Sequence, residues 1–71
     1  MKLPAGKLTV RLSIEVEQEE DGRWRAEVPE LSGPGVLAYG QTRGAAIDRA
    51  KALALRVIAD RLDHGERLPS I

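Results

Sequence analysis

The sequence predicts an α+β domain: a three-stranded antiparallel meander with one helix packed across one face, in the order β-β-β-α. Three observations predict this fold. Two segments near the start alternate apolar and polar residues, a short apolar run follows a turn-rich stretch, and a long segment then places apolar residues at helical spacing. A chain of 71 residues has room for a single domain, residues 1–71, with a thin core.

The first predicted strand follows a leader at residues 1–6 and runs from Lys7 to Gln18. A strict period of two over this length is typical of a strand with one side on the core and the other in water. The inward face would hold five apolar residues, namely Leu8, Val10, Leu12, Ile14 and Val16. A second strand, from Arg23 to Val28, continues the pattern with Trp24, Ala26 and Val28 inward. Trp24 is therefore expected to anchor the core.

The turn between these strands follows from the rule that inward residues face inward residues across an antiparallel pair. A two-residue loop at Asp21-Gly22 would set Val16 opposite Glu27 and fails this test. A three-residue loop, residues 20–22, satisfies it and places Gly22 at the positive φ that a type I turn plus bulge requires. The facing pairs would be Gln18–Trp24, Val16–Ala26 and Ile14–Val28, with Glu17–Arg25 and Glu15–Glu27 on the outer face.

The third strand is predicted over residues 36–39, after Pro29, which cannot donate a ladder hydrogen bond, and a compact turn cluster at residues 32–35. A continuous apolar run of this length is typical of a strand covered on both faces. Only one of the pairs Val36/Ala38 and Leu37/Tyr39 can face the helix, and the chain offers no second layer for the other. Tyr39 is therefore interpreted either as a contact for a partner protein or as a core residue covered by a loop. Gly40 is expected to break the strand.

A helix is predicted from about Arg43 to Leu62, with Thr42 as its N-cap and Gly65 as its left-handed C-terminal cap. Apolar residues spaced three and four apart would face the sheet, namely Ala46, Ile47, Ala50, Leu53, Ala54, Val57, Ile58 and Leu62. Residues 68–71 are compatible with a short fourth strand.

Composition narrows the classes of function. The chain contains no cysteine, which excludes a disulfide framework, a thiolate metal site and a cysteine nucleophile. Eleven basic and eleven acidic residues cancel, which argues against direct contact with nucleic acid. No segment approaches the ~18 apolar residues of a membrane helix, and the first residues do not resemble a signal peptide, so a cytoplasmic location is expected. The lack of asparagine and the excess of arginine over lysine, eight to three, fit either a thermophile or a GC-rich genome.

Candidate catalytic groups are few. The only histidine, His64, is expected in the last helical turn, where a cationic imidazole favours the helix dipole. The three serines have no neighbouring base, and the glycines before the helix form no phosphate-binding motif. A strand meander plus helix also resembles a truncated ribonuclease H core. However, its candidate carboxylates, Glu15, Glu17 and Glu27, are interleaved with arginines that would neutralise a two-metal site. The sequence therefore predicts no enzyme, no metal site and no cofactor.

A series of short motifs bears more directly on function. The acidic hairpin Asp21-Gly22 is followed by Pro29-Glu30-Leu31 and Pro34-Gly35, and then by Gly40 and Thr42 at the start of the Ala-rich helix. In this order and spacing, over roughly residues 8–69, they resemble the HicB-like antitoxin domain. Three features depart from that family: a two-residue insertion at residues 32–33, Ala45 in place of a glutamate that would complete the capping box, and Gly44 in the first helical turn.

The resemblance implies a stand-alone, N-terminal-type domain that binds a HicA-type RNA-cleaving toxin and masks its active site, with no enzymatic activity of its own. The family usually adds a DNA-binding segment that residues 1–71 do not contain, so DNA binding is not expected. The implied partner-binding residues lie in the loop and the third strand: Pro29, Glu30, Leu31, Val36, Leu37 and Tyr39. Glu30 is expected to face a cationic active-site rim, while Leu31 and Tyr39 supply apolar anchors.

Two other interpretations remain open on sequence. One is an orphan domain of the same fold with a structural or small-ligand-binding role and no toxin partner. The other is a remnant of a metal-dependent nuclease. In each case, a thin core and an apolar third strand predict a homodimer or a higher even oligomer with Tyr39 at the seam.

Overall fold

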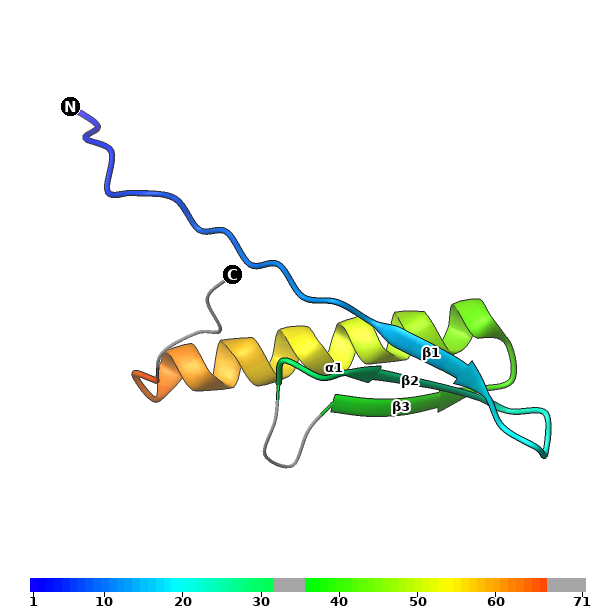
Figure 1. Ribbon diagram of the computed structural model, residues 1–71. Helices are drawn as coiled ribbons and strands as arrows, with labels where there is room; N and C mark the ends of the chain where they lie inside the picture. The colour runs from blue at the N-terminus through cyan, green and yellow to red at the C-terminus, as the bar shows by residue number, and fades with distance from the viewer. Residues whose placement is uncertain (32–35, 67–71) are drawn as a thin grey trace.

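The computed structural model describes residues 1–31 and 36–66. Its elements follow the order β1 (Glu15–Gln18), β2 (Trp24–Val28), β3 (Val36–Gly40) and α1 (Arg43–Asp63). The strands form one antiparallel sheet in the order β1-β2-β3, and α1 lies across one face of it (Figure 1). The predicted α+β meander with one helix is confirmed. The turn cluster at residues 32–35 and the fourth strand at residues 68–71 lie outside the described residues.

The hairpin between β1 and β2 has the predicted register. Gln18 faces Trp24 and Val16 faces Ala26, so the inward residues of the two strands meet on the helix side. The loop is closed by a hydrogen bond of 2.7 Å from Glu19 N–H to Arg23 O, and Gly22 has a φ of 91°. The three-residue turn is therefore confirmed, with glycine at the position that requires a positive φ.

The first strand is shorter than predicted. The ladder between β1 and β2 ends at Glu15 and Glu27, so Ile14 does not pair with Val28 as expected. Beyond Val28 the chain enters Pro29, which has no N–H for a ladder, and Leu31 N–H bonds back to Val28 O at 3.2 Å. The chain before β1 is extended and leaves the body in line with that strand (Figure 1). Residues 7–14, called the arm below, therefore keep the alternation of a strand without a neighbouring strand among the described residues.

The two faces of β3 differ. Val36 and Ala38 are buried against the helix, whereas Leu37 and Tyr39 point to the opposite face and are exposed. No described residue of the chain covers the second face of this strand, so cover by a loop is not seen within residues 1–31 and 36–66, and cover by a partner protein stays a prediction. Gly40 does not break the strand, because it is the last residue of β3 and pairs with Trp24. A Cβ atom there would lie 2.5 Å from Ala46 N, so glycine permits the close approach of β3 to the helix.

The helix lies within one residue of its predicted limits. Thr42 is the N-cap, and its Oγ1 accepts a hydrogen bond of 3.1 Å from Ala45 N–H. At the other end Gly65 has a φ of 72°, as expected for the left-handed cap. The buried face consists of Ala46, Ala50, Ala54 and Ile58. Leu62, expected on this face, is exposed.

The core is built from small side chains between the helix and the two strands that it covers. Its members are Ala26, Val28, Leu31, Val36, Ala38, Ala46, Ala50, Ala54 and Ile58. The largest fully buried side chain is Leu31, whereas Trp24 is only half-buried at the rim of the core. The role of core anchor expected of Trp24 thus falls to Leu31, since the tryptophan lies at the hairpin end of β2.

Candidate partner-binding surface

The sheet face opposite the helix combines exposed apolar and acidic side chains. Leu37 and Tyr39 of β3 are 46 % and 36 % exposed. Across the strands, Leu37 faces Glu27 and Tyr39 faces Arg25, and these two residues of β2 face Glu15 and Glu17 of β1. We call the surface made by these six residues the outer face. It is the only described face of β3 that can reach a partner protein, because the other face is covered by the helix.

Two carboxylates stand opposite each other on the outer face. Glu15 and Glu27 are cross-strand neighbours, and neither forms an ion pair among the described residues. Together with Val16, Glu17 and Arg25 they line a hollow of about 190 Å³. Like charges directly opposite each other in a sheet are destabilising. A cationic group bound between Glu15 and Glu27 would therefore reduce their repulsion.

Arg25 neutralises part of the negative charge of the outer face by ion pairing. Arg25 lies 3.3 Å from Glu17 Oε1 through its Nη2 and 3.4 Å from Glu19 Oε1 through its Nε. Arg25 therefore neutralises the negative charge of the two carboxylates near the hairpin. The negative charge of Glu15 and Glu27, at the other end of the outer face, is not neutralised by it. The sequence-based argument that arginines interleave with the acidic residues thus applies to only one end of the outer face.

The ring of Tyr39 is positioned by a second arginine. The guanidinium carbon of Arg23 lies 4.7 Å from the ring centroid, within the range of a cation–π contact. The same guanidinium bonds Asp21 Oδ2 at 2.8 Å. A hydrogen bond from Arg23 N–H is the main cause of the lowered pKa of Asp21, and the guanidinium adds to it. Tyr39 is therefore exposed but oriented, which reduces the entropy that it would lose on binding a partner.

The structure brings together only part of the partner-binding set predicted from the sequence. Leu31 is 1 % exposed and Val36 is 3 % exposed, so neither can anchor a partner, and the expectation of an exposed Leu31 is wrong. Leu31 is buried because the chain folds back after Val28 and directs this side chain under the sheet. Pro29 and Glu30 are exposed, and with Leu37 and Tyr39 they remain accessible.

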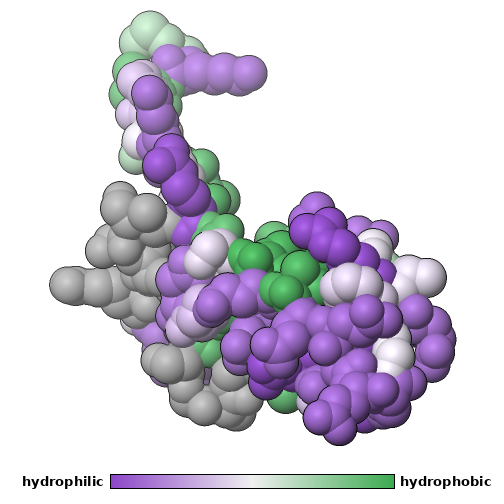
Figure 2. All heavy atoms as spheres, turned by 45° about the vertical axis from the view of Figure 1, so that its right-hand side comes forward, coloured by the Kyte–Doolittle hydropathy of each residue, from purple (hydrophilic) through white to green (hydrophobic). Residues whose placement is uncertain are grey.

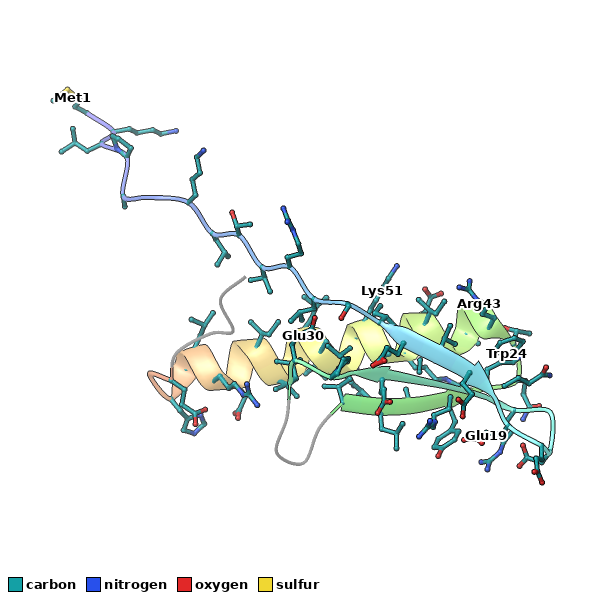
Figure 3. The ribbon with its side chains drawn as sticks, in the orientation of Figure 1. Met1, Glu19, Trp24, Glu30, Arg43 and Lys51 are labelled. Atoms are coloured by element: carbon teal, nitrogen blue, oxygen red, sulfur yellow. The ribbon has the colours of Figure 1, made fainter. Side chains whose placement is uncertain are left out.

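Glu30 has a role within the chain. Its Oε2 accepts hydrogen bonds from Ser13 N–H at 3.0 Å and from Ser13 Oγ at 2.6 Å. These bonds, the side-chain bond first, lower the pKa of Glu30. Figure 3 shows Glu30 at the end of β2, beside the chain that enters β1. The carboxylate that the sequence assigns to a partner thus already fastens the arm to the body.

The histidine and acidic side chains of the described residues are the candidate ligands for a metal site. Within residues 1–31 and 36–66, no group of three histidine, aspartate or glutamate side chains could hold a metal ion. His64, predicted in the last helical turn, is the C-cap residue directly after it. Its Nδ1 lies 2.8 Å from Asp60 O, and this contact and the charge of Asp60 raise the pKa of His64. Its position agrees with a structural role.

Two residues of the outer face were not included in the partner-binding set predicted from the sequence. Glu15 and Glu27 were expected to face each other, but their lack of a counter-ion depends on which carboxylates Arg25 reaches. Their unfavourable pairing was the signal that could have identified them. The contact of Ser13 with Glu30 spans 17 residues and carries no local sequence signal.

Comparison of the chain with models of known protein families, with curated proteins and with solved structures finds no match. Within the described residues, no helix is both long enough and apolar enough to cross a membrane.

Proposed function

We propose that this chain is a non-enzymatic, HicB-like binding module that neutralises a HicA-type RNA-cleaving toxin by covering its active site. The observation that carries the proposal is the outer face, where exposed Leu37 and Tyr39 adjoin the unbalanced carboxylates of Glu15 and Glu27. Apolar anchors beside excess negative charge fit a cationic protein surface, which an RNA-cleaving enzyme needs in order to hold phosphates. The motif order of the sequence supports the same class of partner.

The outer face supplies both the affinity and the selectivity in this proposal. Leu37 and Tyr39 lose water when a partner covers them, while the hollow beside Glu15 and Glu27 accepts a lysine or arginine side chain. Arg25 stays with Glu17 and Glu19 and keeps those carboxylates from competing. Association is expected to slow as salt rises, since the steering charge lies at the exposed surface.

Leu37→Lys is the most discriminating variant for this proposal. The new ammonium would face Glu27 across the strands, a favourable pair that preserves the sheet. The same charge would repel a cationic partner and remove an apolar anchor. We therefore expect unchanged melting and at least a tenfold loss of affinity for the toxin. The matched control is Leu62→Lys, which introduces the same charge at an exposed leucine near the end of the helix, outside the outer face.

The experiment expresses the adjoining reading frame of the source genome together with each variant and follows growth. Wild type and Leu62→Lys are expected to suppress the toxicity of a small basic ribonuclease encoded there, while Leu37→Lys does not. Titration of the purified proteins at two salt concentrations checks the affinity directly. A neighbour without toxicity, or toxicity that wild type does not suppress, would reject the antitoxin function and favour the orphan domain. Equal rescue by all three proteins would instead remove Leu37 and the outer face from the interface with the toxin.

A further inference from the structure

On the side of β1 and the arm that faces away from β2, a defined set of backbone groups has no hydrogen-bond partner within residues 1–31 and 36–66. Glu19 N–H donates to Arg23 O of the hairpin, and Ser13 N–H donates to Glu30 just beyond β2. Because N–H groups alternate in direction along an extended chain, the odd-numbered residues point toward β2 and the even-numbered ones point away from it. The outward set comprises Leu8, Val10, Leu12, Ile14, Val16 and Gln18. None of their backbone groups is hydrogen-bonded within the described residues.

The same edge is bordered by an apolar groove. Since α1 packs mainly over β2 and β3, no other described helix or strand covers the helix side of the arm. A groove of about 270 Å³ lies there. Its lining is mainly apolar and includes one charged residue, Lys51 of the helix; the other lining residues are Val10, Leu12, Ile14, Val28, Ala54, Leu55 and Ile58. Leu8 is 78 % exposed beyond the end of the groove. Figure 2 shows hydrophobic side chains along the arm and again where it joins the body.

An open edge of this length with one apolar side is an aggregation site unless another strand covers it. We propose that a second copy of this chain covers it, by antiparallel pairing of the arm and β1 with the same segment of the partner copy. The two sheets then join into one sheet of six strands around a twofold axis. This interface uses the backbone edge of β1 and does not rest on the proposed toxin, and Glu15 and Glu17 of the outer face lie beside it.

The pattern of side chains selects the register. In a symmetric pairing centred on Leu12, Leu12 faces Leu12 of the second copy, Val10 faces Ile14, and Leu8 faces Val16. Every apolar residue of the segment then meets an apolar residue, and each of these pairs exchanges two backbone hydrogen bonds. A shift by one residue would set apolar residues opposite polar ones and direct the wrong backbone groups to the seam. Centring on Arg11 would set two guanidinium groups opposite each other.

Charge on the polar side supports the same arrangement. The arm is basic near its start, at Lys7, and the chain becomes acidic at Glu15 and Glu17. Antiparallel pairing about Leu12 places Lys7 of each copy opposite Glu17 of the other, and Thr9 opposite Glu15. A parallel pairing in register would instead set like charges side by side. The segment is therefore complementary to itself in the antiparallel sense only.

The helices of the two copies do not clash in this six-stranded sheet. A twofold axis normal to the sheet places both helices on the same face, each above its own β2 and β3. With a strand spacing of about 4.8 Å, the helix axes would be separated by about 19 Å, which exceeds the distance of packed helices. The space between them is where the apolar side chains of the two arms meet, so the groove becomes the core of the dimer.

Proline substitution at neighbouring positions tests the seam. Val10→Pro removes an N–H that points to the second copy and places the ring in the seam. Thr9→Pro removes an N–H that points the other way, where no β2 residue pairs with it. In light scattering at high micromolar concentration, we expect wild type and Thr9→Pro at twice 7.7 kDa and Val10→Pro at 7.7 kDa. All three should have the same far-ultraviolet circular dichroism per residue in the helical bands.

Three outcomes would overturn this proposal. A monomeric wild type would do so, and protected amide protons at Val10 and Leu12 in that monomer would show that another part of the same chain covers the edge. Equal assembly of the two proline variants would remove the arm from the seam. If Tyr39→Glu dissociates the dimer and Val10→Pro does not, the dimer interface lies at the third strand, as expected from the sequence.

Discussion

The two edge strands of this sheet, β1 and β3, differ in how their outward backbone groups are protected from pairing with another strand. β3 is a short edge whose outward backbone groups belong to Leu37 and Tyr39, and Arg49 Nη1 of the helix donates to Tyr39 O at 2.6 Å. The edge of β1 is longer, because the arm extends it, and no side chain of the described residues blocks it. Short length and a charged side chain are common means of protecting an edge from pairing. β3 is thus protected by a side chain of the same chain, whereas no residue within 1–31 and 36–66 protects the edge of β1, which the proposed dimer would cover.

The difference lies in how each edge is joined to the helix. β3 ends at Gly40, against the first turn of α1, so the strand and the helix approach closely at that point. Among the described residues, the arm is joined to the rest of the chain by the contact of Ser13 with Glu30 and by the partial packing of Leu12 and Ile14. A strand sequence thus fixes an extended conformation, while its burial depends on what lies beside it.

The largest expected effect comes from separating β3 from the helix. Gly40→Ala would place a Cβ atom 2.5 Å from Ala46 N and 3.0 Å from Ala45 C, and backbone atoms cannot move aside cheaply. We expect a loss of about 1–3 kcal/mol in the free energy of unfolding, since an overpacked contact must be relieved by moving the helix. For a chain of this size each kcal/mol lowers Tm by about 4–8 °C.

Gly44→Ala is the matched control for that measurement. A Cβ atom at Gly44 meets nothing within 4 Å, and the residue lies in the first turn of α1. The same substitution should therefore raise the free energy of unfolding by up to about 1 kcal/mol through helix propensity. Thermal denaturation of the two variants should give shifts of opposite sign, and a neutral Gly40→Ala would show that β3 and the helix can separate at no cost.

The sequence predicted the features that depend on neighbouring residues. Gly22 determined the hairpin loop and thereby the register, and Thr42 and Gly65 determined the ends of the helix. These are local effects of turn and cap geometry.

The features that the sequence did not predict depend on distant contacts. The end of the β1 ladder is set by Pro29, directly after β2, and Leu31 is buried where the chain turns back after Val28, with Leu31 N–H bonded to Val28 O. Gly40 has the appearance of a strand breaker until the helix is seen against it. For the outer face, alternation predicted which residues are exposed, but not that Arg25 would neutralise only one end.

A smaller effect is expected when the protection of the β3 edge is removed. Arg49→Ala deletes the hydrogen bond to Tyr39 O and should cost about 0.5–1.5 kcal/mol. Arg56→Ala is the control, because Arg56 is exposed on the same helix and forms no ion pair among the described residues. Urea denaturation measures both. If Arg49→Ala and Arg56→Ala have equal midpoints, the arginine does not hold the edge of β3 in solution.

The smallest expected effect is a dependence of the arm's attachment on pH. Hydrogen bonds from Ser13 lower the pKa of Glu30 in the folded chain relative to the unfolded chain. The attachment therefore contributes to stability above the unfolded-state pKa and is lost as the pH falls through the folded-state pKa. Its contribution is small, because the carboxylate is exposed to solvent. Since Ser13 N–H points toward Glu30, this attachment uses the side of the arm away from the proposed dimer seam.

Nuclear magnetic resonance should show the amide proton of Ser13 shifting with the titration of the Glu30 carboxyl, at a midpoint below that of an unfolded-chain glutamate. Glu30→Gln should abolish this step and leave the amide shifts of β3 unchanged. A Ser13 amide that does not respond to acid would mean that the arm is attached to the body by its apolar packing alone.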